Sequence, residues 1–80
     1  MANRHDLQDW IIQALQSLEG AGAIADVCRY VWDHHENDLR NSDDLFFTWQ
    51  YDIRWAATRL RESGRLKEAD QSPKGIWELV

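Results

Sequence analysis

The side chains best suited to chemistry lie on one face of a segment with helical spacing, residues 48–64. At roughly 100° per residue, this face gathers the polar side chains Gln50, Arg54, Thr58 and Arg61. An arginine can bond guanine through two donors, and a glutamine can bond adenine in a similar bidentate way. The spacing therefore favours a surface that reads DNA base edges, and a merely solvated polar face is the alternative.

Three further side chains are candidates for DNA contact. Tyr51 lies at the margin of the polar face, where it could stack or bond a phosphate, or else pack against the preceding loop. Lys67 and Lys74 belong to an expected hairpin, where lysines either contact the DNA backbone or protect a strand edge from pairing. The predicted DNA-binding residues are therefore Gln50, Tyr51, Arg54, Thr58, Arg61, Lys67 and Lys74.

The helix that must position these side chains also has an apolar face. Within one narrow arc fall the side chains of Trp49, Ile53, Ala56 and Leu60. Such an arc is typical of a helix that packs against a core. Thr48 is a suitable N-cap, and Gly64 suits the position just beyond the C-terminus, so we expect a helix over residues 48–63.

The strongest periodicity in the chain predicts a first helix over residues 4–19. Its apolar positions are Leu7, Trp10, Ile11, Ala14, Leu15 and Leu18. Asn3 and Asp6 resemble a capping box with shortened side chains at the start of this helix, and Gly20 ends it. Residues 20–23 are small and flexible, which predicts a tight connection with one or two extended residues.

A second helix is expected over residues 24–35. Its apolar stripe consists of Ile24, Val27, Cys28 and Val31. The polar run 36–44 is rich in turn formers and predicts a loop, or a segment with one short helical turn. Because Phe46, Phe47 and Trp49 are too large to be left together in water, we expect this segment to tuck beneath the third helix and close the core.

The spacing changes from helical to alternating after Gly64. This predicts strands over residues 65–70 and 75–80, joined by a turn at 71–75. Three helices followed by a C-terminal β-hairpin wing give an α+β fold in the order of a winged helix-turn-helix. We expect one domain that spans residues 1–80.

Length and composition limit the classes of protein. A chain of 80 residues with 44% hydrophobic side chains fits one small domain and excludes a multidomain enzyme. Cys28 is the only cysteine, so no internal disulfide can form, and the N-terminus does not resemble a signal peptide. No apolar run approaches the roughly 18 to 20 residues that cross a bilayer. A cytoplasmic protein without membrane contact is therefore expected.

The net charge of −5 opposes DNA binding at first sight, because phosphate contacts need Lys or Arg. The charges are unevenly distributed. Residues 1–50 hold three basic and nine acidic side chains, a net charge of −6, whereas residues 51–80 hold six and five, a net charge of +1. An ordinary acidic cytoplasmic protein can show the same modest asymmetry.

Patterns typical of metal binding or catalysis are absent from the sequence. His34, His35 and Cys28 lack the paired spacing of structural zinc sites, and adjacent helical residues point about 100° apart. No nucleophile–base arrangement or phosphate-cradling glycine loop is present. We therefore expect no metal, no cofactor and no enzyme activity.

The stretch Ile53–Leu66, with Arg54-Trp55-Ala56 near its start and Lys74–Leu79 beyond it, resembles the N-terminal winged-helix domain of Mrr-type restriction endonucleases. The resemblance covers most of the chain, and it implies DNA recognition by the third helix and the wing. It also implies binding without cleavage, because the nuclease domain of that family is lacking. A small regulator or a restriction-system accessory is the expected role.

A protein-interaction module is the alternative. In that case the acidic N-terminal half would dock a basic partner, or exposed aromatic side chains would form a homodimer.

Overall fold

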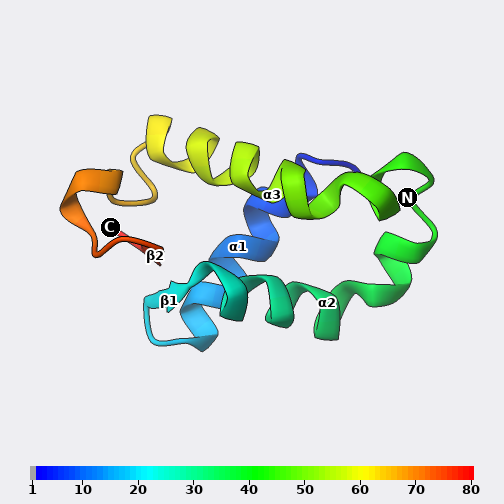
Figure 1. The fold of residues 1–80 in the computed structure, drawn as a ribbon, viewed down its shortest axis with the longest axis horizontal. Helices are drawn as coiled ribbons and strands as arrows, with labels where there is room; N and C mark the ends of the chain where they lie inside the picture. Colours follow the sequence, from blue (N-terminus) through cyan, green and yellow to red (C-terminus); the bar gives the residue numbers. More distant parts are fainter. Residues whose placement is uncertain (1) are drawn as a thin grey trace.

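The computed structural model, which describes residues 2–80, contains three helices and a two-stranded antiparallel sheet (Figure 1). In chain order the elements are α1 (Asp6–Ser17), β1 (Ala21–Ala23), α2 (Ile24–Arg40), α3 (Asp44–Glu62), the 3-10 turn η1 (Ala69–Gln71) and β2 (Ile76–Glu78). The sheet lies at one end of an elongated body of 35 × 21 × 17 Å. This layout confirms the predicted α+β class and is consistent with a winged helix.

Helix α1 is the central element, since both other helices pack against it. Leu7, Ile11 and Leu15 are fully buried on one stripe, as the periodicity predicts. The helix begins at Asp6, two residues later than predicted, with His5 at its N-cap and no side-chain cap. Of the expected capping box only the bond from the Asn3 backbone N–H to the Asp6 carboxylate, at 2.9 Å, is present, because the Asn3 side chain accepts from the His5 N–H instead. Gly20 follows the helix with a φ of +100°, a conformation that glycine adopts without steric cost.

Helix α2 is longer than predicted, because it continues to Arg40 rather than ending near His35. Of the two forms expected for residues 36–44, the plain loop is therefore wrong, and the short helical segment is present over residues 36–40. His35 has non-helical dihedrals (φ −129°, ψ 19°), so the helix is kinked where the prediction ended it. Beyond the kink, Leu39 is fully buried, and its burial holds a second helical segment on the core. The Arg40–Glu36 ion pair at 2.6 Å bridges one turn of that segment.

Helix α3 begins four residues earlier than the predicted start at Thr48. Thr48 lies inside the helix, where its hydroxyl donates to the Asp52 carboxylate at 2.7 Å instead of capping an end. Leu45 extends the buried apolar arc toward the N-terminus, and this explains the longer helix. At the other end Gly64 has a φ of +79°, as expected for a residue just past a helix C-terminus.

The aromatic residues at the start of α3 do not all enter the core. Trp49 is 5% exposed and Phe46 is partly buried, but the side chain of Phe47 is 82% exposed. The expectation that the segment tucks beneath α3 is wrong for Phe47, because residues 46 and 47 lie inside the helix and point to different faces.

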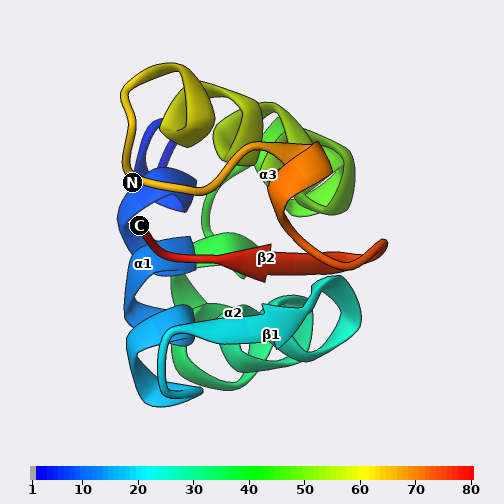
Figure 2. The same ribbon diagram turned by 90° about the vertical axis from the view of Figure 1, so that its left-hand side faces the viewer.

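The C-terminal strands pair differently from the predicted hairpin. Strand β2 pairs with β1, with Gly22 opposite Trp77, and Figure 2 shows the two strands side by side and antiparallel. The predicted strand over residues 65–70 is reduced to a single bridge between Leu66 and Leu79, and the Lys67 N–H donates to the Glu78 carbonyl at 2.9 Å. From Ala69 the chain forms η1 instead.

His35 at the kink of α2 is expected to make stability depend on pH. Its ring stacks on Trp10 at 4.0 Å, and burial lowers its pKa from the ordinary 6.5, while the nearby Asp38 partly opposes this shift. The unfolded chain then takes up the proton first, so stability is full above about pH 6.5 and falls as the pH decreases. Urea unfolding at about pH 7.5 and about pH 5.5 measures the difference. The His35→Phe variant keeps a flat ring on Trp10, and an unchanged pH dependence in it would contradict this prediction.

Within residues 2–80, no helix combines the length and the apolar character that crossing a membrane requires.

Candidate nucleic-acid interface

Four of the predicted DNA-binding residues lie together on the outer face of α3. This face, opposite the buried arc, presents the exposed side chains of Gln50, Tyr51, Arg54 and Thr58. Tyr51 is 77% exposed, so it does not pack against the preceding loop. The Thr58 hydroxyl donates to the Arg54 carbonyl at 3.1 Å. Its proton is therefore occupied, and Thr58 offers an acceptor and a methyl group to a ligand.

Arg61 follows Thr58 by three residues and lies on the same side of α3, at the end of the helix. Arg61 is half-buried at the C-terminal end of α3 and lines a pocket of about 250 Å³ with residues of the C-terminal turn. Lys74 lines the same pocket and is exposed. Arg61 and Lys74, which are 13 positions apart in the sequence, are thus neighbours at the loop over residues 67–75, between the Leu66 bridge and β2, which is here termed the wing.

Lys67 is the weakest member of the predicted set. Its ammonium group lies 3.3 Å from the Glu78 carboxylate across the strand pair. This ion pair reduces the positive potential that Lys67 can offer to a phosphate. The sequence could not show the pairing, because it depends on which strands meet.

The basic side chains fall into two groups by their partners. Four form ion pairs: Arg29 with Asp26, Arg40 with Glu36, Arg59 with Glu62, and Lys67 with Glu78. In the part of the chain that the structure describes, five others have no carboxylate within ion-pair distance: Arg4, Arg54, Arg61, Arg65 and Lys74. Arg54, Arg61 and Lys74 belong to the predicted set, so positive charge remains available at α3 and the wing.

Arg4 is a candidate that sequence reasoning missed. Its guanidinium carbon lies 4.2 Å from the centre of the Trp55 ring, a cation–π contact that holds it against α3. Arg4 also lines a pocket of about 390 Å³ with Tyr51, Arg54 and Thr58, and the Asp52 side chain, which accepts from the Thr48 hydroxyl, lines it as well. No sequence signal links residue 4 to α3, because the contact depends on how the chain folds back before α1.

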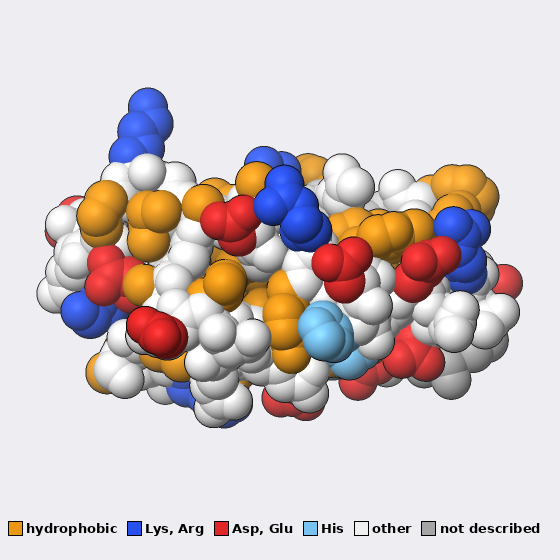
Figure 3. Space-filling view, turned by 90° about the horizontal axis from the view of Figure 1, so that it is seen from below, with side chains coloured by type: hydrophobic (Ala, Val, Ile, Leu, Met, Phe, Trp, Pro, Cys, Tyr) orange, Lys and Arg blue, Asp and Glu red, His pale blue; other side chains and the backbone are white. Residues whose placement is uncertain are grey.

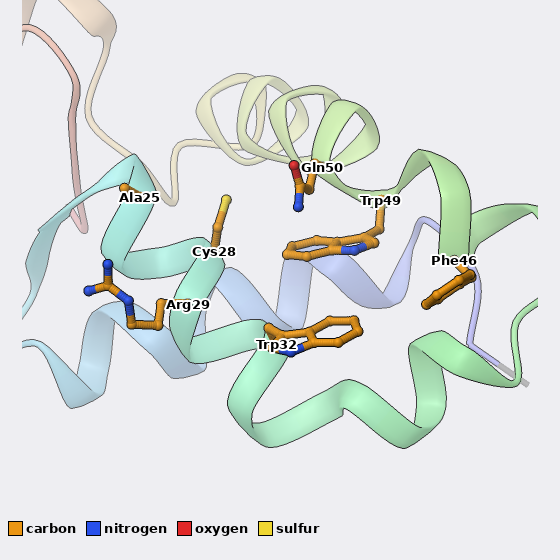
Figure 4. A pocket seen from close by; sticks show the side chains of 7 residues that line it. All are labelled: Ala25, Cys28, Arg29, Trp32, Phe46, Trp49 and Gln50. Carbon is orange, nitrogen blue, oxygen red and sulfur yellow. The ribbon is translucent and has the colours of Figure 1, made fainter.

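A groove of about 510 Å³ runs between α2 and α3 (Figure 4). The rings of Trp32 and Trp49 lie nearly parallel at its base, 6.2 Å apart and inclined by 10°, and Phe46 closes one end. Gln50 reaches its rim from α3. The exposed ring of Phe47 stands against Phe46 with 5.0 Å between centroids. The aromatic surface therefore borders the outer face of α3.

Cys28 also lines this groove. Burial raises the pKa of its thiol, and the positive charge of Arg54 opposes the shift. The thiol is therefore protonated at neutral pH and unsuited to nucleophilic chemistry. Across residues 2–80, no three His, Cys, Asp or Glu side chains are grouped so that they could hold a metal ion.

The face formed by α2 carries mixed charges. In the space-filling view, acidic, basic and hydrophobic side chains alternate along this face without a continuous basic band (Figure 3). Asp26–Arg29 and Glu36–Arg40 are ion pairs within α2. This side of the molecule therefore presents no continuous basic surface.

Comparison of the chain with protein-family models, with curated proteins and with solved structures finds no match.

Proposed function

We propose that the chain binds duplex DNA without cleaving it, with the outer face of α3 in the major groove and the wing against the backbone. The observation that carries this proposal is the location of the basic side chains without acidic partners. Arg54 lies on the outer face of α3, Arg4 beside it, and Arg61 with Lys74 at the wing. Cations that form no ion pair within the described residues are the ones most able to exchange small counterions for phosphates.

The side chains on α3 suit base readout. Gln50 and Arg54 are exposed and lie on the same side of the helix, since four residues separate them. They can form bidentate hydrogen bonds with adenine and guanine respectively, while Tyr51 can stack on a sugar or donate to a phosphate. The resemblance to Mrr-type winged-helix domains supports the same assignment, as a small regulator or restriction-system accessory in the cytoplasm.

A titration of labelled duplexes against salt tests this proposal. If about four phosphates are neutralised, affinity should fall roughly a hundredfold between about 50 mM and about 200 mM salt. Duplexes of unrelated sequence should bind more weakly than a selected one. Failure to bind any duplex at the lower salt concentration would contradict the proposed function.

Self-association is the second candidate function, and the exposed Phe47 beside the groove favours it. In a two-fold symmetric dimer the same surface of each copy faces the other. The exposed Phe47 side chain of each copy could then enter the groove of its partner. Such a dimer would cover Gln50, which lines the groove, and would compete with DNA. Light scattering on the titrated samples separates the two functions, since a monomeric mass at high concentration would contradict the dimer.

A further inference from the structure

The pocket between the end of α3 and the wing has two buried donors without acceptors. The Arg61 Nε and the Ser72 hydroxyl each expose less than 1 Å² to solvent and find no hydrogen-bond partner within residues 2–80. Both residues line this pocket of about 250 Å³. A buried donor without an acceptor costs free energy, and such groups in proteins call for an explanation. The Arg61 Nε–H group lacks an acceptor, and the Ser72 hydroxyl, which can donate as well as accept, lacks any partner.

The charge around the pocket specifies the kind of acceptor. Arg61 and Lys74 line it, and among the described residues no aspartate or glutamate does. Two cations and a hydroxyl without a carboxylate suit an anion with several oxygen atoms, because each oxygen can accept from a different donor.

The size and frame of the pocket are suited to such an anion. Its volume is several times the ~30 Å³ that one water molecule occupies in the liquid, so a tetrahedral oxyanion fits. The rim is held in place by backbone bonds: the Ile24 N–H donates to the Gly75 carbonyl at 3.1 Å, and the Ile76 N–H to the Pro73 carbonyl at 3.0 Å. The turn that carries Lys74 is therefore already formed before a ligand arrives.

We propose that this pocket is an oxyanion site that takes one backbone phosphate of a DNA duplex, with the Arg61 and Ser72 side chains turning from their buried positions to donate to its oxygens and Lys74 adding a second positive charge. The proposal rests on the proposed function for the source of the phosphate. It gives Arg61 a role different from that of Arg54: Arg61 fixes the register of the protein on the backbone, and Arg54 reads bases. It also adds Ser72, which no sequence pattern indicates.

Ser72→Ala is the sharpest variant for a test. Because the hydroxyl has no partner in the protein, its removal should leave the free energy of unfolding unchanged or slightly increased. Affinity for duplex should nevertheless fall about fivefold, since a hydrogen bond to a charged oxygen is lost. Ser63→Ala is the matched control, because the Ser63 hydroxyl already donates to the Leu60 carbonyl at 3.0 Å and does not line this pocket. Its affinity for duplex should equal that of the wild type.

Arg61→Gln completes the test. It should weaken binding about tenfold to all duplex sequences equally, and lower the salt slope by about one, as expected for a lost phosphate contact. Combined with Ser72→Ala it should weaken binding by less than the product of the two single effects, because both donors serve one ligand. If both variants bind duplex like the wild type, the oxyanion site is wrong and the proposed function stands.

Inorganic phosphate distinguishes the two sources of the anion. Phosphate, compared with chloride at equal ionic strength, should raise the thermal midpoint of the wild type more than that of Ser72→Ala or Arg61→Gln. If the wild type binds no duplex but shows this difference, the proposed function fails and the pocket is a site for a free oxyanion. If duplex binding and the phosphate effect are both absent, the oxyanion site is overturned as well.

Discussion

Replacing Arg54 by glutamate is expected to reduce the affinity for duplex DNA by about a hundredfold. Arg54 is exposed on the outer face of α3, has no carboxylate partner among residues 2–80, and shares a pocket with Arg4. Loss of an arginine contact costs about 1–3 kcal/mol, and the new carboxylate would in addition repel the phosphates. Since 1.4 kcal/mol corresponds to tenfold, the two effects together give about two orders of magnitude.

Arg65→Glu is the matched control, because it changes the net charge by the same amount at a different place. Arg65 is also exposed and outside every ion pair of the described chain, but it lines a pocket with Ile12 and Gln16 of α1, away from the outer face of α3. Anisotropy titrations of both variants with duplex DNA at one salt concentration show whether the loss of affinity depends on where the charge is changed. Equal losses would mean that only total charge matters, and α3 would then not be the reader.

The overall charge of −5 does not decide this question, because electrostatic interactions in salt are local. At physiological ionic strength the screening length is about 8 Å, so charges at one end of a body 35 Å long hardly act at the other. Carboxylates on α2 are partly neutralised by Arg29 and Arg40 on the same helix. What DNA would meet at α3 and the wing is the local set of unpaired cations.

Sequence periodicity correctly predicted the features that depend on the geometry of a single helix. The buried arc of α3 and the stripe of α1 follow from a 3.6-residue repeat, and so does the exposed set Gln50, Tyr51, Arg54 and Thr58 on the opposite face of α3. Each of these inferences needs only the geometry of the helix. They therefore agree with the structure even though the start of α3 was predicted four residues too late.

Features that depend on tertiary contacts could not be predicted from the sequence. Residues 21–23 were expected to include an extended part, but their pairing with β2 follows from the folded chain, not from three small residues. Arg4 approaches Trp55, and Ser72 approaches Arg61, across long stretches of sequence. The extent of the helix beyond His35 could not be predicted, because Leu39 is the only large apolar residue in the polar run 36–44.

Leu39→Ala is expected to lower the free energy of unfolding by about 2–4 kcal/mol. Leu39 is fully buried and is the only buried residue of α2 beyond the kink. Its truncation removes the contact that ties this segment to the core and leaves a cavity behind. For a chain of 80 residues this is a large share of a total stability of about 5–15 kcal/mol. Urea unfolding followed by tryptophan fluorescence measures the loss.

Leu18→Ala is the control of the same residue type. Leu18 is 36% exposed at the end of α1, so its truncation should cost roughly 1 kcal/mol or less. If Leu39→Ala is no more destabilising than this control, the segment after His35 does not depend on its buried leucine. If the prediction holds, part of the effect should be local, because residues 36–40 lead directly into α3. Hydrogen exchange should then increase most at the α2–α3 connection, where the groove aromatics Trp32 and Phe46 would also lose their fixed spacing.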